Sequence, residues 1–480
     1  MKILLMNVPD LSIAKTSSSW QLEASDIGIF PPIGIMYLAG ALRAHGRHEA
    51  VLLDTILERM NHAEVVREAQ RVRPDVLGMT VYTPNLHDAL NLSKRLREAL
   101  PGTIIVWGGP HADLFPRESL VHDCVDYLVL GEAEHTLPRF LDALEDKAPL
   151  DDIPALVYRG ADGQPVFTGP AGFVKDIDSL PFPAFDALDF RRYFSAIGTG
   201  QSVGTICSSR GCPFNCTFCC RPYSSYRTRS VENILAEMEA YHREGIREFF
   251  FFDDLFNASA KRVRTIAQAI LDRGWDVTWS FRGRVDAIDE DMLALARRSG
   301  CRQILFGVET STDEGLRDIN KKITIAQVRR AMKMCRKAGI VTSTNWIIGF
   351  PHHKTREDVL HLIETAVSID SDFAQFNILI VYHGTKIFED GVKLGLFDAD
   401  IWRNQALDPV PNFVEPIWEQ HLSRDELSKL LKRCYMRFYF RPMPILRKVL
   451  SLRSPRQFLL YAKGALKLLG IGQGRRKDED

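Results

Sequence analysis

Two blocks of alternating strand and helix patterns constrain the fold more than any other feature of this 480-residue sequence. In the first block, near-continuous apolar runs such as "KILLMNV", "DVLGMTVY" and "TIIVWGG" are typical of parallel strands that are buried on both faces. Amphipathic stretches such as "HDALNLSKRLREAL" separate these runs and have helical periodicity. Five such strands with intervening helices predict a doubly wound, Rossmann-like α/β domain over residues 1–148.

The second block starts near residue 201 and repeats the alternation six times, with strands such as "GTICSS", "EFFFFDD" and "VTSTNWIIGF". The helices between the strands are expected at 230–244, 259–273, 289–298, 324–338 and 355–369. Six units predict a partial barrel over residues 201–400, because a closed barrel of this kind has eight. We expect a linker with a small hairpin at 149–200 and a helical C-terminal region at 401–480.

The composition argues against several classes of protein. Lys+Arg and Asp+Glu are both 61, so no net field attracts nucleic acid, and we expect none as a partner. The stretch "MKILLMNVPD" is too short an apolar run for a secretory leader, and no run of about 18 apolar residues could span a bilayer. We therefore expect a cytoplasmic, reducing location, in which a disulfide framework is rare.

The stretch "CSSRGCPFNCTFCC" holds five of the nine cysteines and directly follows the first strand of the second block. Ligands of such folds lie at the carboxyl ends of the strands, so this loop is a candidate site. Cys212, Cys216 and Cys219 have the spacing C-x3-C-x2-C, which suits a [4Fe–4S] cluster with one open iron. The alternative is zinc, with Cys207 or Cys220 as a fourth ligand, although structural zinc usually has two separated ligand pairs.

The segment "CPFNCTFC", with the aromatic Phe218 before its last cysteine, resembles the radical S-adenosylmethionine (SAM) superfamily. This resemblance implies a catalytic cluster held by Cys212, Cys216 and Cys219, whose open iron binds SAM. Reductive cleavage of SAM would yield a 5′-deoxyadenosyl radical that takes hydrogen from the substrate. The resemblance also implies an electron donor such as flavodoxin or ferredoxin.

The same resemblance implies which residues contact SAM. Phe218 would present its backbone to adenine, Glu309 of "GVE" would accept from the ribose, and Gly349 of "IIGFP" would lie beside adenine. The family's "GGE" after the second strand is absent. "FFFDDLF" stands there instead, so Asp253 or Asp254 would bind the SAM amine, unless Asp254 is a helix N-cap.

Two arginines follow the third strand of the second block, in "SFRGR". Arg282 and Arg284 would either meet the carboxylate of SAM or be solvated.

The first block has no G-x-G-x-x-G after its first strand, which disfavours a dinucleotide. Three of its strands end in "TVYTPN", "WGGPHA" and "LGEAE", and this arrangement resembles the cobalamin (B12)-binding domain of cobalamin-dependent radical SAM enzymes. The residues that the resemblance places at cobalamin are Thr80, Tyr82, Thr83, Gly108, Gly109, Gly131 and Glu132. The histidine loop of other B12 domains is missing, and His87 and His111 are expected at the surface or at helix starts. A purely structural domain remains the alternative.

The pairing of these two domains implies C-methylation of an unactivated carbon of a small or lipid-like intermediate. The alternative is an oxidative cyclase, because "FPPIGIMYLAGAL" and "LPFPAFD" resemble the magnesium-protoporphyrin ester cyclase group. A methylthiotransferase is disfavoured because it would need a second cysteine cluster in the N-terminal domain, and residues 1–200 contain only Cys124. A non-enzymatic sensor is disfavoured by the open-site cluster. The basic amphipathic stretch at 456–469 either makes peripheral membrane contact or packs on the barrel.

Overall fold

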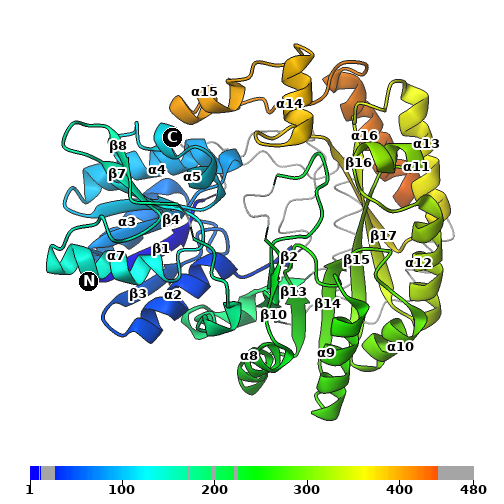
Figure 1. The fold of residues 1–480 in the computed structure, drawn as a ribbon, viewed down its shortest axis with the longest axis horizontal. Coiled ribbons are helices and arrows are strands. Elements are labelled where there is room, and N and C mark those ends of the chain that lie inside the picture. Colours follow the sequence, from blue (N-terminus) through cyan, green and yellow to red (C-terminus); the bar gives the residue numbers. More distant parts are fainter. Residues whose placement is uncertain (10, 12–27, 171, 196–201, 221–224, 442–480) are drawn as a thin grey trace.

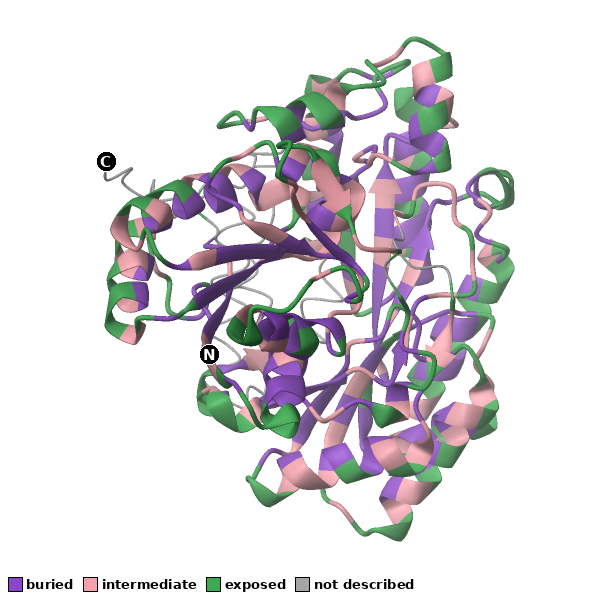
Figure 2. Ribbon diagram, turned by 60° about the vertical axis from the view of Figure 1, so that its left-hand side comes forward, coloured by how far each residue is buried: buried purple, intermediate pink, exposed green. Residues whose placement is uncertain are grey.

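The computed structural model describes residues 1–9, 11, 28–170, 172–195, 202–220 and 225–441. Two α/β bodies lie side by side, the N-terminal one drawn in blue to cyan and the other in green to orange (Figure 1). Each contains one large sheet, of seven and six strands respectively. Figure 2 shows that the strands of both sheets are largely buried, whereas the helices around them have exposed outer faces.

The first sheet has the strand order β3-β1-β4-β5-β6-β7-β8. Its strands are β3 (Glu49–Leu53), β1 (Lys2–Asn7), β4 (Val76–Thr80), β5 (Ile104–Gly108), β6 (Tyr127–Val129), β7 (Leu156–Arg159) and β8 (Pro165–Phe167). The first five are parallel, which confirms the predicted doubly wound fold. The hairpin expected in the linker is antiparallel to β6, so this sheet continues past residue 148 to Phe167.

Alternate residues of the central strands point to opposite faces of the sheet, as strand geometry requires. Leu4 and Met6 belong to one apolar core, and Ile3 and Leu5 belong to the other. Helices α3 (His62–Val72) and α4 (Leu86–Ala99) pack together, as do α2 (Ile33–His45) and α7 (Thr136–Asp146). Two short helices that the sequence did not predict, α5 (Pro110–Leu114) and α6 (Pro116–Ser119), follow β5.

The second sheet has six parallel strands in chain order, which confirms the partial barrel. They are β10 (Val203–Ile206), β13 (Glu248–Phe251), β14 (Thr278–Gly283), β15 (Cys301–Glu309), β16 (Val341–Ile348) and β17 (Phe373–Ile378). The outer helices are α8 (Val231–Arg243), α9 (Ala260–Asp272), α10 (Glu290–Arg298), α12 (Ile325–Ala338) and α13 (Arg356–Ile369). Their bounds follow the predicted ranges closely because N-caps such as Ser230, Thr324 and Thr355 mark where they begin.

The described part of the C-terminal region contains the helices α14 (Lys386–Lys393), α15 (Ile401–Leu407) and α16 (Arg424–Tyr439). The hydroxyl of Tyr435 and the backbone N–H of Phe376 on β17 lie 3.2 Å apart, so α16 protects the open edge of the barrel. α15 reaches the first domain, where His122 Nε2 lies 3.1 Å from the Ala406 carbonyl oxygen. The predicted helix at 456–469 lies outside the described residues. Within the described part of the chain, no helix is both long and apolar enough to cross a membrane.

Candidate functional site

A cavity of about 340 Å³ lies between the two domains, where the carboxyl ends of their strands meet. From the first domain it is lined by Thr80, Tyr82, Gly108, Gly109, Gly131 and Glu132, which are six of the seven residues predicted at cobalamin. The second domain contributes Cys207, Ser209, Arg210, Gly211, Phe252 and Asp254. The seventh predicted residue, Thr83, lines a separate, water-sized cavity with Glu415. The topology therefore brings loops from both halves of the chain to one space.

The glycines at the end of β5 are required by close packing of the backbone. Gly109 has φ +91°, and a Cβ there would lie 3.0 Å from Thr80 Cγ2 and 3.1 Å from the Val81 oxygen. A Cβ on Gly108 would lie 3.3 Å from the Val129 oxygen. Gly34 differs, because it lines the cavity and a Cβ there would meet nothing within 4 Å. The strand ends therefore pack closely on one another, and open space for a bound group lies beside Gly34 on α2.

The two histidines of this region are not exposed metal ligands. His111 lies in the first turn of α5, as expected for a helix-start residue, but it is fully buried, and its Nδ1 lies 3.1 Å from Thr83 Oγ1. Burial lowers the pKa of His111 to about 3, so the ring is neutral near pH 7. His87 Nδ1 lies 3.0 Å from the Pro409 carbonyl oxygen, which joins the first domain to the C-terminal region.

The cysteine loop is anchored at the carboxyl edge of the barrel by contacts with several elements. Thr217 N–H donates to the Ile319 carbonyl at 3.1 Å, and its own carbonyl accepts from Ile387 N–H at 3.1 Å. The guanidinium of Arg284 lies 3.7 Å from the centre of the Phe214 ring. The short strands β11 (Ser209–Arg210) and β12 (Arg227–Thr228) pair with each other and enclose the loop.

Within the part of the chain that the structure describes, the three thiols of the C-x3-C-x2-C motif do not have the spacing of a preformed zinc site. A tetrahedral zinc site, with Zn–S near 2.3 Å, requires its sulfurs to be roughly 3.8 Å apart. Among the described residues, Cys212, Cys216 and Cys219 do not form a group of ligand atoms within 4.8 Å of one another. Burial raises the pKa of Cys207 to about 12, and Cys220 Sγ lies 3.8 Å from the His383 carbonyl oxygen.

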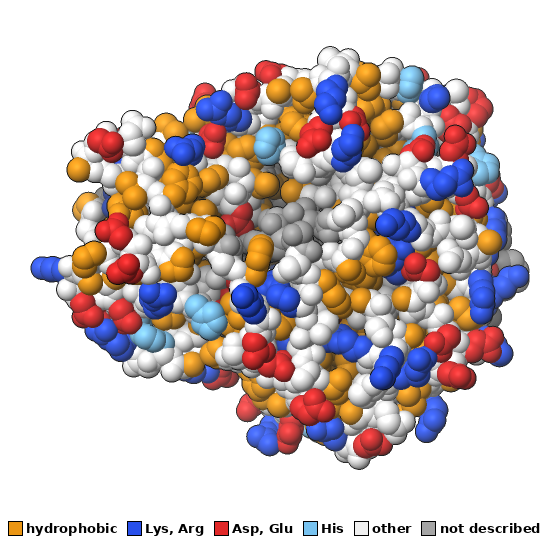
Figure 3. Space-filling model, in the orientation of Figure 1, with side chains coloured by type: hydrophobic (Ala, Val, Ile, Leu, Met, Phe, Trp, Pro, Cys, Tyr) orange, Lys and Arg blue, Asp and Glu red, His pale blue; other side chains and the backbone are white. Residues whose placement is uncertain are grey.

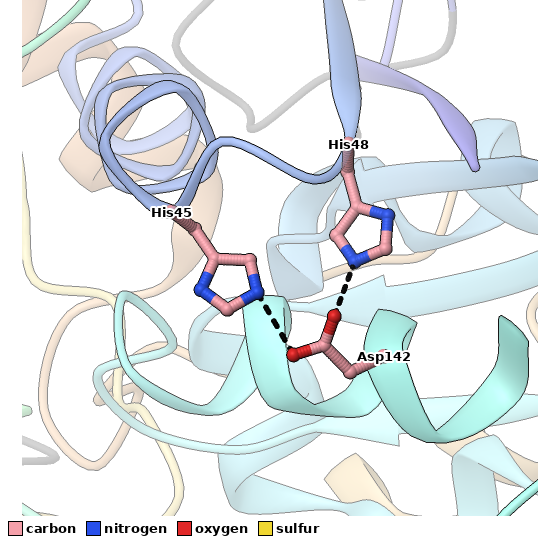
Figure 4. A group of neighbouring side chains, drawn as sticks. All are labelled: His45, His48 and Asp142. Atoms are coloured by element: carbon pink, nitrogen blue, oxygen red, sulfur yellow. Dashed lines mark hydrogen bonds and ion pairs between the residues drawn. The ribbon is translucent and has the colours of Figure 1, made fainter. Parts of the chain in front are cut away.

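Among the described residues, His45, His48 and Asp142 do meet that 4.8 Å spacing (Figure 4). They lie near the start of β3 and do not line the cavity. His45 and His48 contact the two carboxylate oxygens of Asp142 at 2.8 and 3.0 Å. Arg47 Nη1 also lies 2.9 Å from Asp142 Oδ1. The Arg47 guanidinium already binds the Asp142 carboxylate, which a metal cation would need as a ligand. We therefore interpret this group as a set of ion pairs that links the end of α2 to α7.

Glu309, predicted to contact ribose, ends β15 in the left-handed region with φ +76°. Lys321 Nζ donates to its carboxylate at 2.7 Å, and both side chains are buried. Gly307 makes room for this pair, because a Cβ there would lie 2.2 Å from Glu309 Oε1. Burial lowers the pKa of Lys321, but the charges of Glu309 and Cys216 outweigh burial and raise it. Lys321 thus places a positive charge beside the cysteine loop, and no local pattern predicted it.

Two of the predicted SAM contacts come from loops that pack on one another. The Phe218 and Phe350 ring centroids are 5.4 Å apart in an edge-to-face arrangement. Gly349, with φ +86°, precedes Phe350 at the turn after β16. His353 Nδ1 accepts from the N–H groups of Gly349 and Phe350 at 3.1 and 3.3 Å, and fixes this turn.

The structure corrects the prediction for Asp253. Its carboxylate is buried and accepts from the N–H groups of Ser208 and Ser209 at 2.6 and 3.0 Å, so it braces the loop from inside. Asp254 is exposed, lines the cavity, and is not a helix cap, because α9 begins at Ala260. The group that faces the open site is therefore Asp254.

The two predicted arginines, Arg282 at the end of β14 and Arg284 directly after it, differ in burial. Arg284 is buried and donates to Asp286 at 3.0 Å and to the Lys321 carbonyl at 2.8 Å, so it is structural. Arg282 is exposed and lies 4.8 Å from the centre of the Phe252 ring, beside a residue that lines the cavity.

The face of the molecule drawn in Figure 3 carries no single sign of charge. On the face drawn in Figure 3, acidic and basic side chains are interspersed among apolar ones over both domains. This face of the described residues therefore shows no continuous basic surface.

A partial barrel with three thiols after its first strand, facing a doubly wound domain across one cavity, defines an α/β enzyme with two cofactor sites. A family model described as the radical SAM superfamily matches residues 206–366, and a B12 binding domain model matches residues 24–141. The chain belongs to the radical SAM enzymes that carry a B12-binding domain. This confirms the predicted cofactors, which are a [4Fe–4S] cluster, SAM and cobalamin.

Named relatives include both methyltransferases and a cyclase. An uncharacterized methyltransferase from Pyrococcus horikoshii is 31% identical over 94% of this chain and 95% of its own length. The anaerobic magnesium-protoporphyrin IX monomethyl ester cyclase of Rubrivivax gelatinosus is 26% identical, with coverages of 86% and 74%. The hopanoid C-3 methylase of Methylococcus capsulatus is 29% identical, with coverages of 68% and 63%. Among solved structures, the cobalamin-dependent radical enzyme OxsB has a TM-score of 0.72 at 16% identity, covering 98% of this chain and 72% of its own.

Proposed function

We propose that this enzyme methylates an unactivated carbon of a small or lipid-like biosynthetic intermediate, with cobalamin as the methyl carrier. The observation that carries the proposal is the single cavity shared by the two sites. Gly211, which directly precedes Cys212, lines the same cavity as Gly108 and Gly109. A substrate between the two cofactors would meet both reactive centres without leaving the protein, and such proximity supplies much of a rate enhancement.

When bound, the cluster with SAM supplies a 5′-deoxyadenosyl radical, and cobalamin supplies the methyl group. In this proposal Cys212, Cys216 and Cys219 hold the cluster. Phe218, Glu309, Gly349 and Arg282 position SAM, with Asp254 in place of Asp253 at its amine. Thr80, Tyr82, Gly108, Gly109 and Gly131 cradle cobalamin.

The chain's own residues also determine what surrounds the reaction. The cavity walls include Ile33, Leu38, Val106, Leu137 and Phe252, so water is largely displaced once a cofactor fills the space. The required electrons would come from a protein donor such as flavodoxin or ferredoxin. The names of the Pyrococcus and Methylococcus relatives support methyl transfer, and the second supports a lipid-like substrate.

The test uses anaerobically reconstituted enzyme, methyl-labelled SAM, hydroxocobalamin, a chemical reductant and fractionated small-molecule and lipid extracts. We expect a product that is heavier by one methyl group and carries the label. 5′-Deoxyadenosine and S-adenosylhomocysteine should each form in roughly equal amount with it. Omitting cobalamin should stop the product.

The second candidate is an oxidative cyclase, which the relative from Rubrivivax gelatinosus favours. It predicts 5′-deoxyadenosine together with a product that has lost hydrogens and gained no label. That outcome would contradict the methylation proposal.

A further inference from the structure

Two acidic residues after β6 pair across the domain boundary with two arginines beside the cysteine loop. Arg227 donates to both carboxylate oxygens of Glu132 at 2.6 and 2.7 Å. Arg210 Nη2 donates to Glu134 at 2.5 Å, and Arg210 Nη1 lies 3.5 Å from Glu132. These four side chains, here called the interdomain ion network, contain two negative and two positive charges and are balanced as a group.

The network joins the cavity to both ends of the cysteine loop. Arg210 on β11 and Arg227 on β12 are register partners, and the chain between them contains all three cluster cysteines. Glu132 and Glu134 line the cavity, as does Arg210. Three of the four residues therefore line the expected cobalamin space, and the fourth, Arg227, joins Glu132 to the far end of the cysteine loop.

The network is buried well enough to resist independent movement of the two loops. The side chains of Glu132, Glu134, Arg227 and Arg210 are 6%, 7%, 11% and 17% exposed. At such burial, removing one partner leaves a charge without compensation, which is far more costly than losing a surface pair.

Further contacts hold both arginines in place. Arg227 donates to the Val174 carbonyl at 2.7 Å, and the guanidinium of Arg210 lies 5.2 Å from the centre of the Tyr37 ring. Tyr37 also lines the cavity, so a group bound there would contact the ring on which the Arg210 guanidinium packs.

We infer that the interdomain ion network couples the two cofactor sites, so that occupancy of either site raises the affinity of the other. This inference rests on the proposed function, because it needs cobalamin in the cavity. A cofactor bound at one domain would fix the charged side chains of the network on that domain's loop. The paired side chains on the other loop would then lose less conformational entropy when the second cofactor binds. Such coupling is reciprocal by thermodynamic necessity.

The test compares hydroxocobalamin affinity in two forms of the full chain, one with the reconstituted cluster and one freed of it by chelation. We expect the cluster-loaded protein to bind hydroxocobalamin at least about fivefold more tightly, measured by anaerobic visible titration. In Glu134→Gln and in Glu132→Gln, the ratio of the two affinities should fall close to one. A ratio of one in the unaltered protein, or an unchanged ratio in both variants, would overturn the inference.

The matched control is Glu118→Gln, which removes another interdomain ion pair. Glu118 lies 2.8 Å from Arg403 on α15 and is not part of the cysteine loop or the cavity lining. This variant should keep the full affinity ratio, so a loss of the ratio there would point to general loosening of the domains and overturn the inference.

If Glu134→Gln fails to fold, the double variant Glu134→Gln/Arg210→Met replaces it, because removing both charges of a buried pair leaves no uncompensated ion. The double variant should also lose the affinity ratio, and a retained ratio would contradict the inference. The proposed function can fail separately: a retained ratio with an unmethylated product would contradict methylation alone. Absence of hydroxocobalamin binding in the unaltered protein would overturn both.

Discussion

At the scale of single residues, His353 is the side chain that ties the two loops expected at SAM. Its Nδ1 accepts from the turn after β16, and its Nε2 lies 3.4 Å from Oγ1 of Thr310, directly after Glu309. An acceptor at Nδ1 requires the neutral ring, with its hydrogen on Nε2. Burial, with a smaller contribution from His352, lowers the pKa of His353 to about 3.

This neutral histidine makes stability depend on pH. The folded pKa of about 3 lies below the unfolded value of about 6.5, so the unfolded chain binds the proton first and stability falls as pH drops below about 6.5. Between pH 7.5 and 5.5, we expect His353 to contribute a loss on the order of 1 kcal/mol. His353→Asn should show a smaller drop in the midpoint of denaturant unfolding over this range. The exposed His135→Asn should keep the full drop, and equal drops in both variants would contradict the prediction.

Gly34 offers a way to block the cavity without straining the backbone. It lies in the first turn of α2, where a leucine side chain would project into open space and also favours the helix. We expect Gly34→Leu to weaken hydroxocobalamin binding by roughly tenfold or more, equivalent to about 1.4 kcal/mol, with no loss of thermal stability. Gly102→Leu, on an exposed turn away from the cavity, is the control. Full binding by Gly34→Leu would mean that cobalamin lies elsewhere.

At the scale of elements, the cysteine loop is anchored by contacts with neighbouring segments of the second domain. Asn320 donates to the Asn215 carbonyl at 2.7 Å, and Asp253 holds the chain at Ser208 and Ser209. The hairpin of β11 and β12 closes the loop at its base. These contacts come from the segments that follow β13 and β15, so the second domain holds the position of the loop.

The loop predicts a specific pattern of cluster loss. Cys212→Ala, Cys216→Ala and Cys219→Ala should each abolish the [4Fe–4S] signal in electron paramagnetic resonance and lower the iron content from about four per chain. Cys301→Ala is the control, because Cys301 is a buried thiol of β15. A full iron content in Cys216→Ala would refute the assignment.

At the scale of the whole molecule, the two domains share one apolar core. The larger cluster of buried side chains runs from Leu4 in the first sheet to Phe438 on α16. α15 adds contacts with α6, including the Arg403–Glu118 pair. An interface that continues the core couples the stability of the two sides.

This shared core predicts cooperative unfolding. Calorimetry of the cluster-free protein should give one transition, with a calorimetric enthalpy close to the van't Hoff value. Two resolved transitions would show that the domains unfold independently. The substitution Glu118→Gln should change the midpoint little, since exposed ion pairs contribute only about 0–1 kcal/mol.

The local pattern of the sequence determined the elements, and its motifs carried the family resemblance that implied the cofactors. Strand and helix periods are set by neighbours a few residues apart, so both sheets and most helices could be predicted. The spacing of Cys212, Cys216 and Cys219 is likewise local. The strand ends "TVYTPN", "WGGPHA" and "LGEAE" could be placed together because parallel strands bring their carboxyl ends to one edge.

Only the tertiary structure decided which polar side chains face the cavity and which are bound elsewhere. Asp253 and Asp254 are adjacent in the sequence, yet one is buried under the loop and the other lines the cavity. Glu132 lines the cavity, but its carboxylate is paired with Arg227, 95 residues away. Lys321 beside Cys216 had no local signal. Such pairings depend on chain segments that meet only after folding, because charge and burial act through space and leave no period in the sequence.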